Sequence, residues 1–195
     1  MPCAIITTPS LMMVLFCQNE SIILFLQGQR GFLLYFNDES EEMDINKTPI
    51  IIGNDHAAYG LKEKIKSYLI EKDIDVEDAG THNEDSVDYS DFGIRVAAEV
   101  STGKFNRGIL LCGTGIGMSM VANKFSHVRA ALCSGLFSAI MSRRHNNSNI
   151  LVIGARVTGS DLAMEIVSAW LSTPFDGGRH QLRIEKFDSL GEAPK

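Results

Sequence analysis

The sequence contains few cysteines and histidines, and none of them stands in a metal-binding pattern. Its 195 residues include four cysteines and five histidines. There is no Cys-x-x-Cys pair, and no two histidines are spaced as metal ligands. Structural zinc sites need such paired ligands. The pattern therefore excludes a zinc module, and it predicts a cytoplasmic protein with reduced thiols and no bound metal.

Long apolar runs and basic runs are also missing. No apolar cluster near the start of the chain approaches the roughly 20 residues that span a bilayer. No lysine or arginine precedes Arg30, so the basic segment of a secretory signal is missing. The net charge is −6, and no basic run offers a surface for a phosphate backbone. We therefore expect neither a membrane nor a nucleic acid among the partners.

Residues 1–48 differ in composition from the rest of the chain. The first 49 residues carry six acidic and two basic side chains, which is most of the net negative charge. Apolar clusters at 22–26 and 32–36 suggest a hairpin, although a hairpin alone is marginally stable. We predict that this part is an extension outside the core and that the functional protein starts near Met43. A tail that packs on a partner is the alternative.

From Pro49 onward, strand signals alternate with helix signals. Short apolar runs predict strands, and apolar residues at helical spacing predict the segments between them. We expect strands at 49–53, 74–79, 108–111, 128–133 and 150–153, and helices at 61–69, 89–102, 118–124, 136–145, 161–171 and 182–187. This order predicts a five-stranded parallel sheet in a doubly wound, Rossmann-like, three-layer α/β/α domain over residues 49–195. Ligands of such sheets bind at the carboxyl ends of the strands, where the polar residues that follow each strand gather.

The segment 109–117 is the most informative one. An apolar strand delivers Cys112 to a glycine-rich turn that opens a helix, where backbone N–H groups favour anions. Met118 stands where a dinucleotide fingerprint needs its third glycine, and no lysine follows as in a phosphate-binding Walker loop. We therefore predict an anion-binding turn with a reactive thiol. A buried, inert cysteine beside a simple chain turn is the alternative.

Two further patterns carry chemistry. Asp55 and His56 follow the first strand directly, where a helix cap with a hydrogen-bonded histidine is the plainer interpretation. Arg179 and Arg183 stand four residues apart after Gly177-Gly178, so a helix places both on one face. Two converging guanidinium groups suit a phosphate, although many such pairs are ordinary surface arginines.

Taken together, these motifs resemble ribose-5-phosphate isomerase of type B, in the ribose/galactose/allose phosphate isomerase family. The resemblance covers residues 49 to about 190 in order, and residues 1–48 have no counterpart in it. Its motifs are Gly53-Asn54-Asp55-His56, Asp88-Tyr89, Cys112-Gly113-Thr114-Gly115-x-Gly117, Ala122-Asn123-Lys124, Arg144-His145-Asn146 and Gly177-Gly178-Arg179-His180-Gln181-x-Arg183.

The resemblance implies a cofactor-free isomerase that interconverts ribose 5-phosphate and ribulose 5-phosphate through an enediolate, a step of the pentose phosphate pathway. It assigns catalytic roles to Cys112 as the base, Thr114 at the enediolate oxygen, His145 in ring opening and Asp55 in hydroxyl proton transfer. It assigns substrate binding to the amides of Gly113, Gly115 and Gly117, to Tyr89 and Asn146 around the sugar, and to His56, Arg156, Arg179 and Arg183 around the phosphate.

The resemblance also implies a homodimer or homotetramer whose active sites are shared between subunits. Within the family, galactose-6-phosphate isomerase subunits generally lack the Arg144-His145-Asn146 segment, which favours a pentose phosphate here. Allose 6-phosphate stays open as a substrate, because one more carbon changes the length of the pocket and not the chemistry. The alternative from another class is a phosphosugar-binding module without turnover, which would not need the thiol of Cys112.

Overall fold

The computed structural model describes residues 7–8, 11–12 and 48–188, and the chain divides into two units, Met1–Met43 and Asp44–Lys195. In the first unit, strand β1 (Thr7–Thr8) pairs antiparallel with β2 (Leu11–Met12). The hairpin predicted between residues 22 and 36 lies outside the described residues. Among the helices of the described part, none has the length and apolar character needed to cross a membrane.

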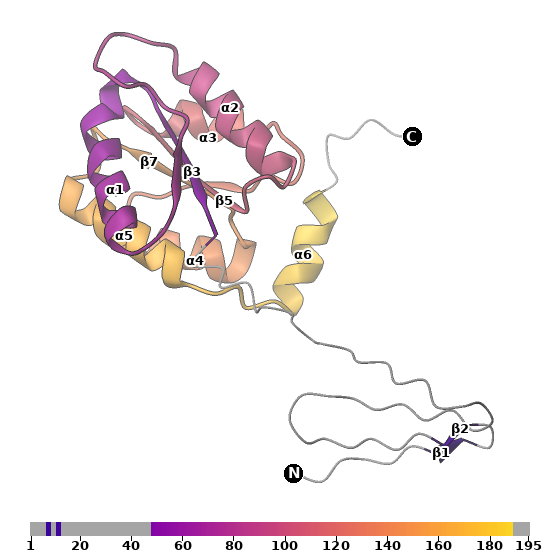
Figure 1. Cartoon of the computed structure of the whole chain (residues 1–195). Helices are drawn as coiled ribbons and strands as arrows, with labels where there is room; N and C mark the ends of the chain where they lie inside the picture. Colours follow the sequence, from indigo (N-terminus) through magenta and orange to yellow (C-terminus); the bar gives the residue numbers. More distant parts are fainter. Residues whose placement is uncertain (1–6, 9–10, 13–47, 189–195) are drawn as a thin grey trace, which may run out of the picture. The chain divides into compact units, whose positions relative to one another are not determined.

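The second unit is built on a parallel sheet of five strands (Figure 1). Their order is β4-β3-β5-β7-β6, and every neighbouring pair is parallel. The three inner strands are buried along their whole length, as expected for strands covered by helices on both faces. This arrangement confirms the predicted five-stranded parallel sheet. The strands are β3 (Ile50–Asn54), β4 (Val76–Asp78), β5 (Arg107–Cys112), β6 (Ala130–Leu132) and β7 (Ile150–Gly154).

Helices cover both faces of the sheet and give the predicted three layers. Apolar side chains of α1, α4 and α5 pack with one face, and those of α2 and α3 pack with the other. The last helix, α6, contacts α4 (Figure 1). The helices are η2 (His56–Ala58, a 3-10 turn), α1 (Tyr59–Glu71), α2 (Tyr89–Ser101), α3 (Ile116–Ala122), α4 (Leu136–Asn146), α5 (Ser160–Ser172) and α6 (Arg179–Asp188).

The two edge strands are shorter than the sequence predicts. Ile74 lies in the turn that ends α1, because its N–H donates to the carbonyl of Leu69 and Asp73 before it has a φ of 62°. Val128 likewise lies in a turn, after His127 with a φ of 61°. Apolar residues at a helix end or in a turn are buried like strand residues, so their composition alone did not separate them from the strands β4 and β6.

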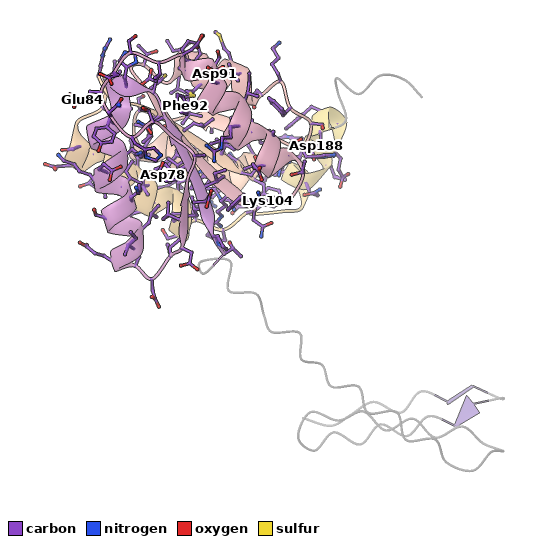
Figure 2. All side chains as sticks on the ribbon, turned by 45° about the horizontal axis from the view of Figure 1, so that its top comes forward. Asp78, Glu84, Asp91, Phe92, Lys104 and Asp188 are labelled. Atoms are coloured by element: carbon purple, nitrogen blue, oxygen red, sulfur yellow. The ribbon has the colours of Figure 1, made fainter. Side chains whose placement is uncertain are left out.

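A buried lysine connects α1 to the carboxyl end of β4. The side chain of Lys62 is fully buried, and its Nζ donates to the Asp78 carboxylate at 2.9 Å and to the Thr81 carbonyl at 2.6 Å. Figure 2 labels Asp78 in this region beside α1. Burial raises the pKa of Asp78, but hydrogen bonds from Lys66 and Lys62 outweigh it and hold that pKa below its ordinary value. The ammonium group is therefore part of the framework that fixes the loop after β4.

We expect Lys62→Met to lower the free energy of unfolding by about 3 kcal/mol, because it leaves the buried Thr81 carbonyl without its lysine donor and removes one of the two lysines that bond the Asp78 carboxylate. Urea unfolding measures the change. The control is Lys64→Met, since Lys64 is exposed on the same helix, and its effect should stay within about 0.5 kcal/mol. Equal stabilities for both variants would contradict the role given to Lys62.

Candidate active site

Cys112 is the last residue of β5, and its side chain opens onto the glycine-rich turn. The residue is only 5% exposed, and the N–H of Gly115 donates to its Sγ at 3.1 Å. This amide contacts the atom that holds the negative charge of a thiolate. Gly115 has a φ of 79°, a conformation that favours glycine, and Ile116 then begins α3. The backbone of the turn thus faces the sulfur because a glycine occupies this position.

Neighbouring side chains and strands pack directly against this turn. A Cβ at Gly115 would lie 2.4 Å from the Leu132 side chain, and one at Gly117 would lie 2.5 Å from the Tyr89 ring. Tyr89 is the first residue of α2 and is partly exposed beside the turn. Thr114 is exposed, and its Oγ1 accepts from the N–H of Ile116 at 3.3 Å. The hydroxyl hydrogen of Thr114 is thereby left to donate to a ligand.

Residues after β3 and β7 lie beside the same turn. The N–H of Asp55 donates to the Leu111 carbonyl at 3.2 Å, and the Asp55 carboxylate caps η2 through the N–H of Ala57 at 3.0 Å. The N–H of Arg156 donates to the Gly113 carbonyl at 2.9 Å. We call this group the thiol half-site. It comprises Asp55, His56, Tyr89, Arg156 and the turn Cys112–Gly117.

His56 has a backbone partner that fixes its ring. The N–H of Val87 donates to its Nδ1 at 3.2 Å. The Val87 carbonyl lies 3.3 Å from the same Nδ1, so this nitrogen has a backbone partner in either tautomer. The ring therefore bridges the turn after β3 and the loop that precedes α2.

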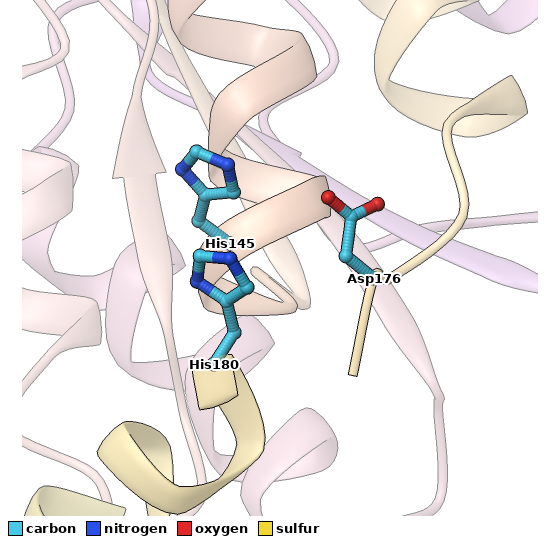
Figure 3. Close-up of side chains that lie close together, drawn as sticks. All are labelled: His145, Asp176 and His180. Atoms are coloured by element: carbon cyan, nitrogen blue, oxygen red, sulfur yellow. The ribbon is translucent and has the colours of Figure 1, made fainter. Parts of the chain in front are cut away.

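The remaining candidate residues gather around the ends of α4 and α6. The rings of His145 and His180 stack with centroids 4.2 Å apart and planes 3° from parallel. Arg144 donates from Nε to both carboxylate oxygens of Asp176, at 3.1 and 3.2 Å. Figure 3 shows the two rings one above the other with Asp176 beside them. Asp176 and His180 were given no role from the sequence; the histidine stands inside the recognised motif, and the aspartate directly precedes its glycine pair.

We call this second group the histidine half-site. It comprises His145, Asn146, Asp176, Arg179, His180 and Arg183. Ligand atoms of His145, Asp176 and His180 lie within 4.8 Å of one another, as metal ligands would. However, parallel stacked rings cannot both direct their nitrogen lone pairs at one ion, and the Asp176 carboxylate is already paired with Arg144. The geometry therefore fits a stacked pair with an ion pair better than a metal site.

The two half-sites lie at opposite ends of the strands: the thiol half-site is at the carboxyl ends, and the histidine half-site is at the amino ends. Cys112 ends β5, whereas His145 and Asn146 end α4 and precede β7. In the register of β5 with β7, Ile150 pairs with Gly108, four residues before Cys112. At about 3.3 Å per residue the thiol and the start of β7 are about 13 Å apart along the strands, and His145 lies further back along the chain. One chain therefore does not bring its own two half-sites together.

A buried thiol and a glycine-rich turn at the carboxyl ends of the strands place the chain among the doubly wound α/β proteins, the class in which ligands bind at this end of the sheet. Comparison with known proteins narrows this class. The chain belongs to the Ribose/Galactose Isomerase family, which matches residues 50–187.

Three relatives illustrate this similarity. Ribose-5-phosphate isomerase B of Escherichia coli is 44% identical over 141 residues, which is 72% of this chain and 95% of the relative. D-erythrulose-4-phosphate isomerase of Pectobacterium atrosepticum is 45% identical over 139 residues, covering 70% of this chain and 91% of the relative. A crystal structure of the ribose 5-phosphate isomerase of Thermotoga maritima matches with a TM-score of 0.70 at 52% identity, covering 72% of this chain and 97% of that chain.

The surroundings of His180 predict how it titrates. Burial lowers the pKa of His180 below its ordinary value, and the nearby His145, Arg179 and Arg183 lower it further. A depressed pKa means that the unfolded chain binds the proton more readily than the folded one. The stack should therefore contribute its full stability above about pH 6.5, and lose it as the pH falls from there through the lower folded pKa.

We expect NMR titration of the histidine rings to give His180 a pKa below that of an ordinary histidine. Arg183→Gln should move it upward, because one of the nearby cations is removed. Arg95→Gln is the control, since Arg95 is exposed on α2 and is not among the charges that shift His180. An unshifted His180 pKa in the native chain would show that the stacked arrangement does not persist in solution.

Proposed function

We propose that the chain is an aldose–ketose isomerase that interconverts ribose 5-phosphate and ribulose 5-phosphate through an enediolate. The observation that carries this proposal is the Cys112 thiol, held at the end of β5 with the Gly115 amide on its sulfur. Membership of an isomerase family and the similarity to ribose-5-phosphate isomerase B support the same substrate.

In this proposal Cys112 moves the proton between the two reacting carbons. Its thiolate takes the proton from C2 of the open-chain aldose, and the thiol returns it to C1 of the enediolate to give the ketose. Negative charge develops on the sugar oxygen during the first transfer. The amides of the turn and the Thr114 hydroxyl donate to that oxygen, and one such donor is typically worth about 3 kcal/mol. Base and charge stabilisation both come from side chains and backbone, so we propose that no cofactor is needed.

We propose that the other groups act before and around this step. His145 opens the furanose ring, and Asp55 moves hydroxyl protons. Tyr89 and Asn146 contact the sugar. The phosphate binds His56, Arg156, Arg179 and Arg183, and this distant anchor orients the reacting carbons.

These roles require a second copy of the chain. A catalytic group acts only within hydrogen-bond reach of the substrate, and in one chain the two half-sites lie at opposite ends of the strands. We propose a homodimer in which the thiol half-site of each protomer faces the histidine half-site of its partner. A homotetramer would pair two such dimers.

Exposed apolar side chains near the thiol half-site support this dimer. Large apolar residues stand exposed on α3, on the first turn of α4 and at the ends of β6 and β7, and Phe137 is 76% exposed. Clusters of this kind mark interaction surfaces. They are Ile116, Met120, Leu132, Leu136, Phe137 and Val157.

The sugar length is the open alternative. The relatives named above act on five-carbon and four-carbon sugar phosphates, so the family chemistry accepts chains of different length. Allose 6-phosphate and galactose 6-phosphate are the six-carbon alternatives. The Arg144-His145-Asn146 segment, whose arginine is paired with Asp176, favours ribose 5-phosphate. Comparing kcat/KM on ribose, allose and galactose phosphates decides between them.

We also propose that residues 49–195 form the isomerase domain and that residues 1–48 are an extension without a catalytic role. All the candidate residues fall between Asp55 and Arg183, and the family match spans 50–187. A cytoplasmic location is consistent with the free thiols of Cys112 and Cys133.

Mixed oligomers test the shared site. We expect Cys112→Ala and His145→Ala each to lose activity about 100-fold or more, because each lacks a proton-transfer group. When the two variants are unfolded, mixed equally and refolded together, each hybrid dimer contains one site with both lesions and one intact site. Ribulose 5-phosphate formation should then recover to about one quarter of the native rate, since hybrids are about half of the dimers.

The matched control mixes Cys112→Ala with Asp55→Asn, two lesions in the same half-site. Every hybrid site then carries one lesion, so the activity should stay at the mean of the two parents. Hybrids that form without recovery in the first mixture would contradict the shared site. A native protein that binds the sugar phosphate without turnover would favour the binding module instead.

A further inference from the structure

The helix α6 carries Arg179 and Arg183, yet it makes few contacts with the rest of the domain. Its buried residues are His180 and Ile184. The helix follows Gly177 and Gly178, which have φ values of 62° and 55°. A helix that follows two such glycines and buries so little is oriented mainly by the contacts at its two ends.

Each end of α6 has one specific contact. At the first turn, His180 stacks on His145. At the last turn, the Asp188 carboxylate accepts from Arg129 Nη1 at 2.7 Å, with His127 Nδ1 3.9 Å from the other carboxylate oxygen. Figure 2 labels Asp188 at this end of the domain. The Arg129 side chain is 16% exposed and that of Asp188 is 31% exposed, so the pair is partly shielded from water.

The guanidinium of Arg129 also bonds the end of α4. Its Nε donates to the Asn147 carbonyl at 3.0 Å, and Asn147 caps α4 directly after His145 and Asn146. One side chain thus connects the C-terminal ends of two helices that are far apart in the sequence. These are the helices that carry the histidine half-site.

The space between these helix ends is open, so packing does not replace this connection. A cavity of about 420 Å³ lies there. Its lining includes Phe125, Val128, Arg129, Asn146, Phe187 and Asp188. Close packing normally holds neighbouring helices in one arrangement. Here a cavity takes the place of close packing. The ion pair between Arg129 and Asp188, both of which line this cavity, therefore sets the relative position of the two helices.

We propose that Arg129 and Asp188 are positioning residues for the isomerase. Their ion pair holds α6 against the end of α4, so that Arg179 and Arg183 meet the phosphate at a fixed distance from His145 and Asn146. This inference rests on the proposed function, in which those four residues contact the substrate. Without the pair, α6 turns about Gly177-Gly178 and the grip on the phosphate loosens, while Cys112 is unaffected.

A merely structural ion pair would behave differently. Partly exposed pairs contribute little to folding, and Asp188 is not part of the apolar cluster that packs α4 on the sheet. A positioning role therefore predicts a larger effect on substrate affinity than on stability, and this difference separates the two interpretations.

The test measures steady-state kinetics of the full chain with Asp188→Asn. We expect KM for ribose 5-phosphate to rise about tenfold and kcat to change less than about twofold, with competitive inhibition by inorganic phosphate weakened by the same factor. Asp188→Glu, which keeps the charge, should restore most of the affinity. Arg129→Met should raise KM similarly and also lower kcat, because it frees the end of α4 that carries His145.

The matched control is Glu185→Gln, which removes the same charge from the same helix. Glu185 is exposed, and among the residues that the structure describes its carboxylate accepts from Gln181 alone, one turn earlier, so KM should stay at the native value. Thermal unfolding should shift by no more than about 2 °C for Asp188→Asn. A native KM in Asp188→Asn, or a loss that Glu185→Gln reproduces, would overturn the positioning role. If the native chain does not isomerise ribose 5-phosphate, the proposed function itself fails.

Discussion

The parallel sheet imposes the constraint on which the site depends. A parallel strand can be followed by its neighbour only after a crossover that carries the chain back along the sheet, here always through a helix. Segments that follow strands therefore lie at the carboxyl ends of the strands, and segments that follow helices lie at the amino ends. Cys112 ends a strand and His145 ends a helix. The separation of the two half-sites thus follows from the topology, and completion of the proposed site requires a second copy.

The shape of the thiol half-site depends on glycines, because a side chain at these positions would collide with its neighbours. Gly115 lets the turn approach Leu132, and Gly117 lets it approach Tyr89. Gly154 at the end of β7 admits the Thr114 carbonyl, which a Cβ there would meet at 2.5 Å. The histidine half-site depends instead on stacking and charge. The positions of its side chains depend on a few long-range contacts around a cavity. The two half-sites should therefore respond differently to substitution.

The sequence predicted the parts that depend on local pattern. β3, β5 and β7 contain the apolar runs 50–52, 109–112 and 150–153, and such runs are typical of strands that are buried on both faces. The turn after Cys112 could be predicted because several glycines that directly follow an apolar run indicate a tight turn. The shorter edge strands β4 and β6 were overestimated, since helix ends and turns also bury apolar residues. The contacts of His180 with His145 and of Arg129 with Asp188 could not be predicted, because they join residues 35 and 59 positions apart and depend on how α6 packs.

A crystal structure with ribulose 5-phosphate bound is the most direct test of the central claim. We expect the reacting carbons to lie about 3.5 Å from Cys112 Sγ of one protomer. The same sugar should be within hydrogen-bond distance of the partner subunit's His145, with its phosphate on the partner subunit's Arg179. A sugar bound to residues of one chain alone, or bound far from Cys112, would contradict the shared site.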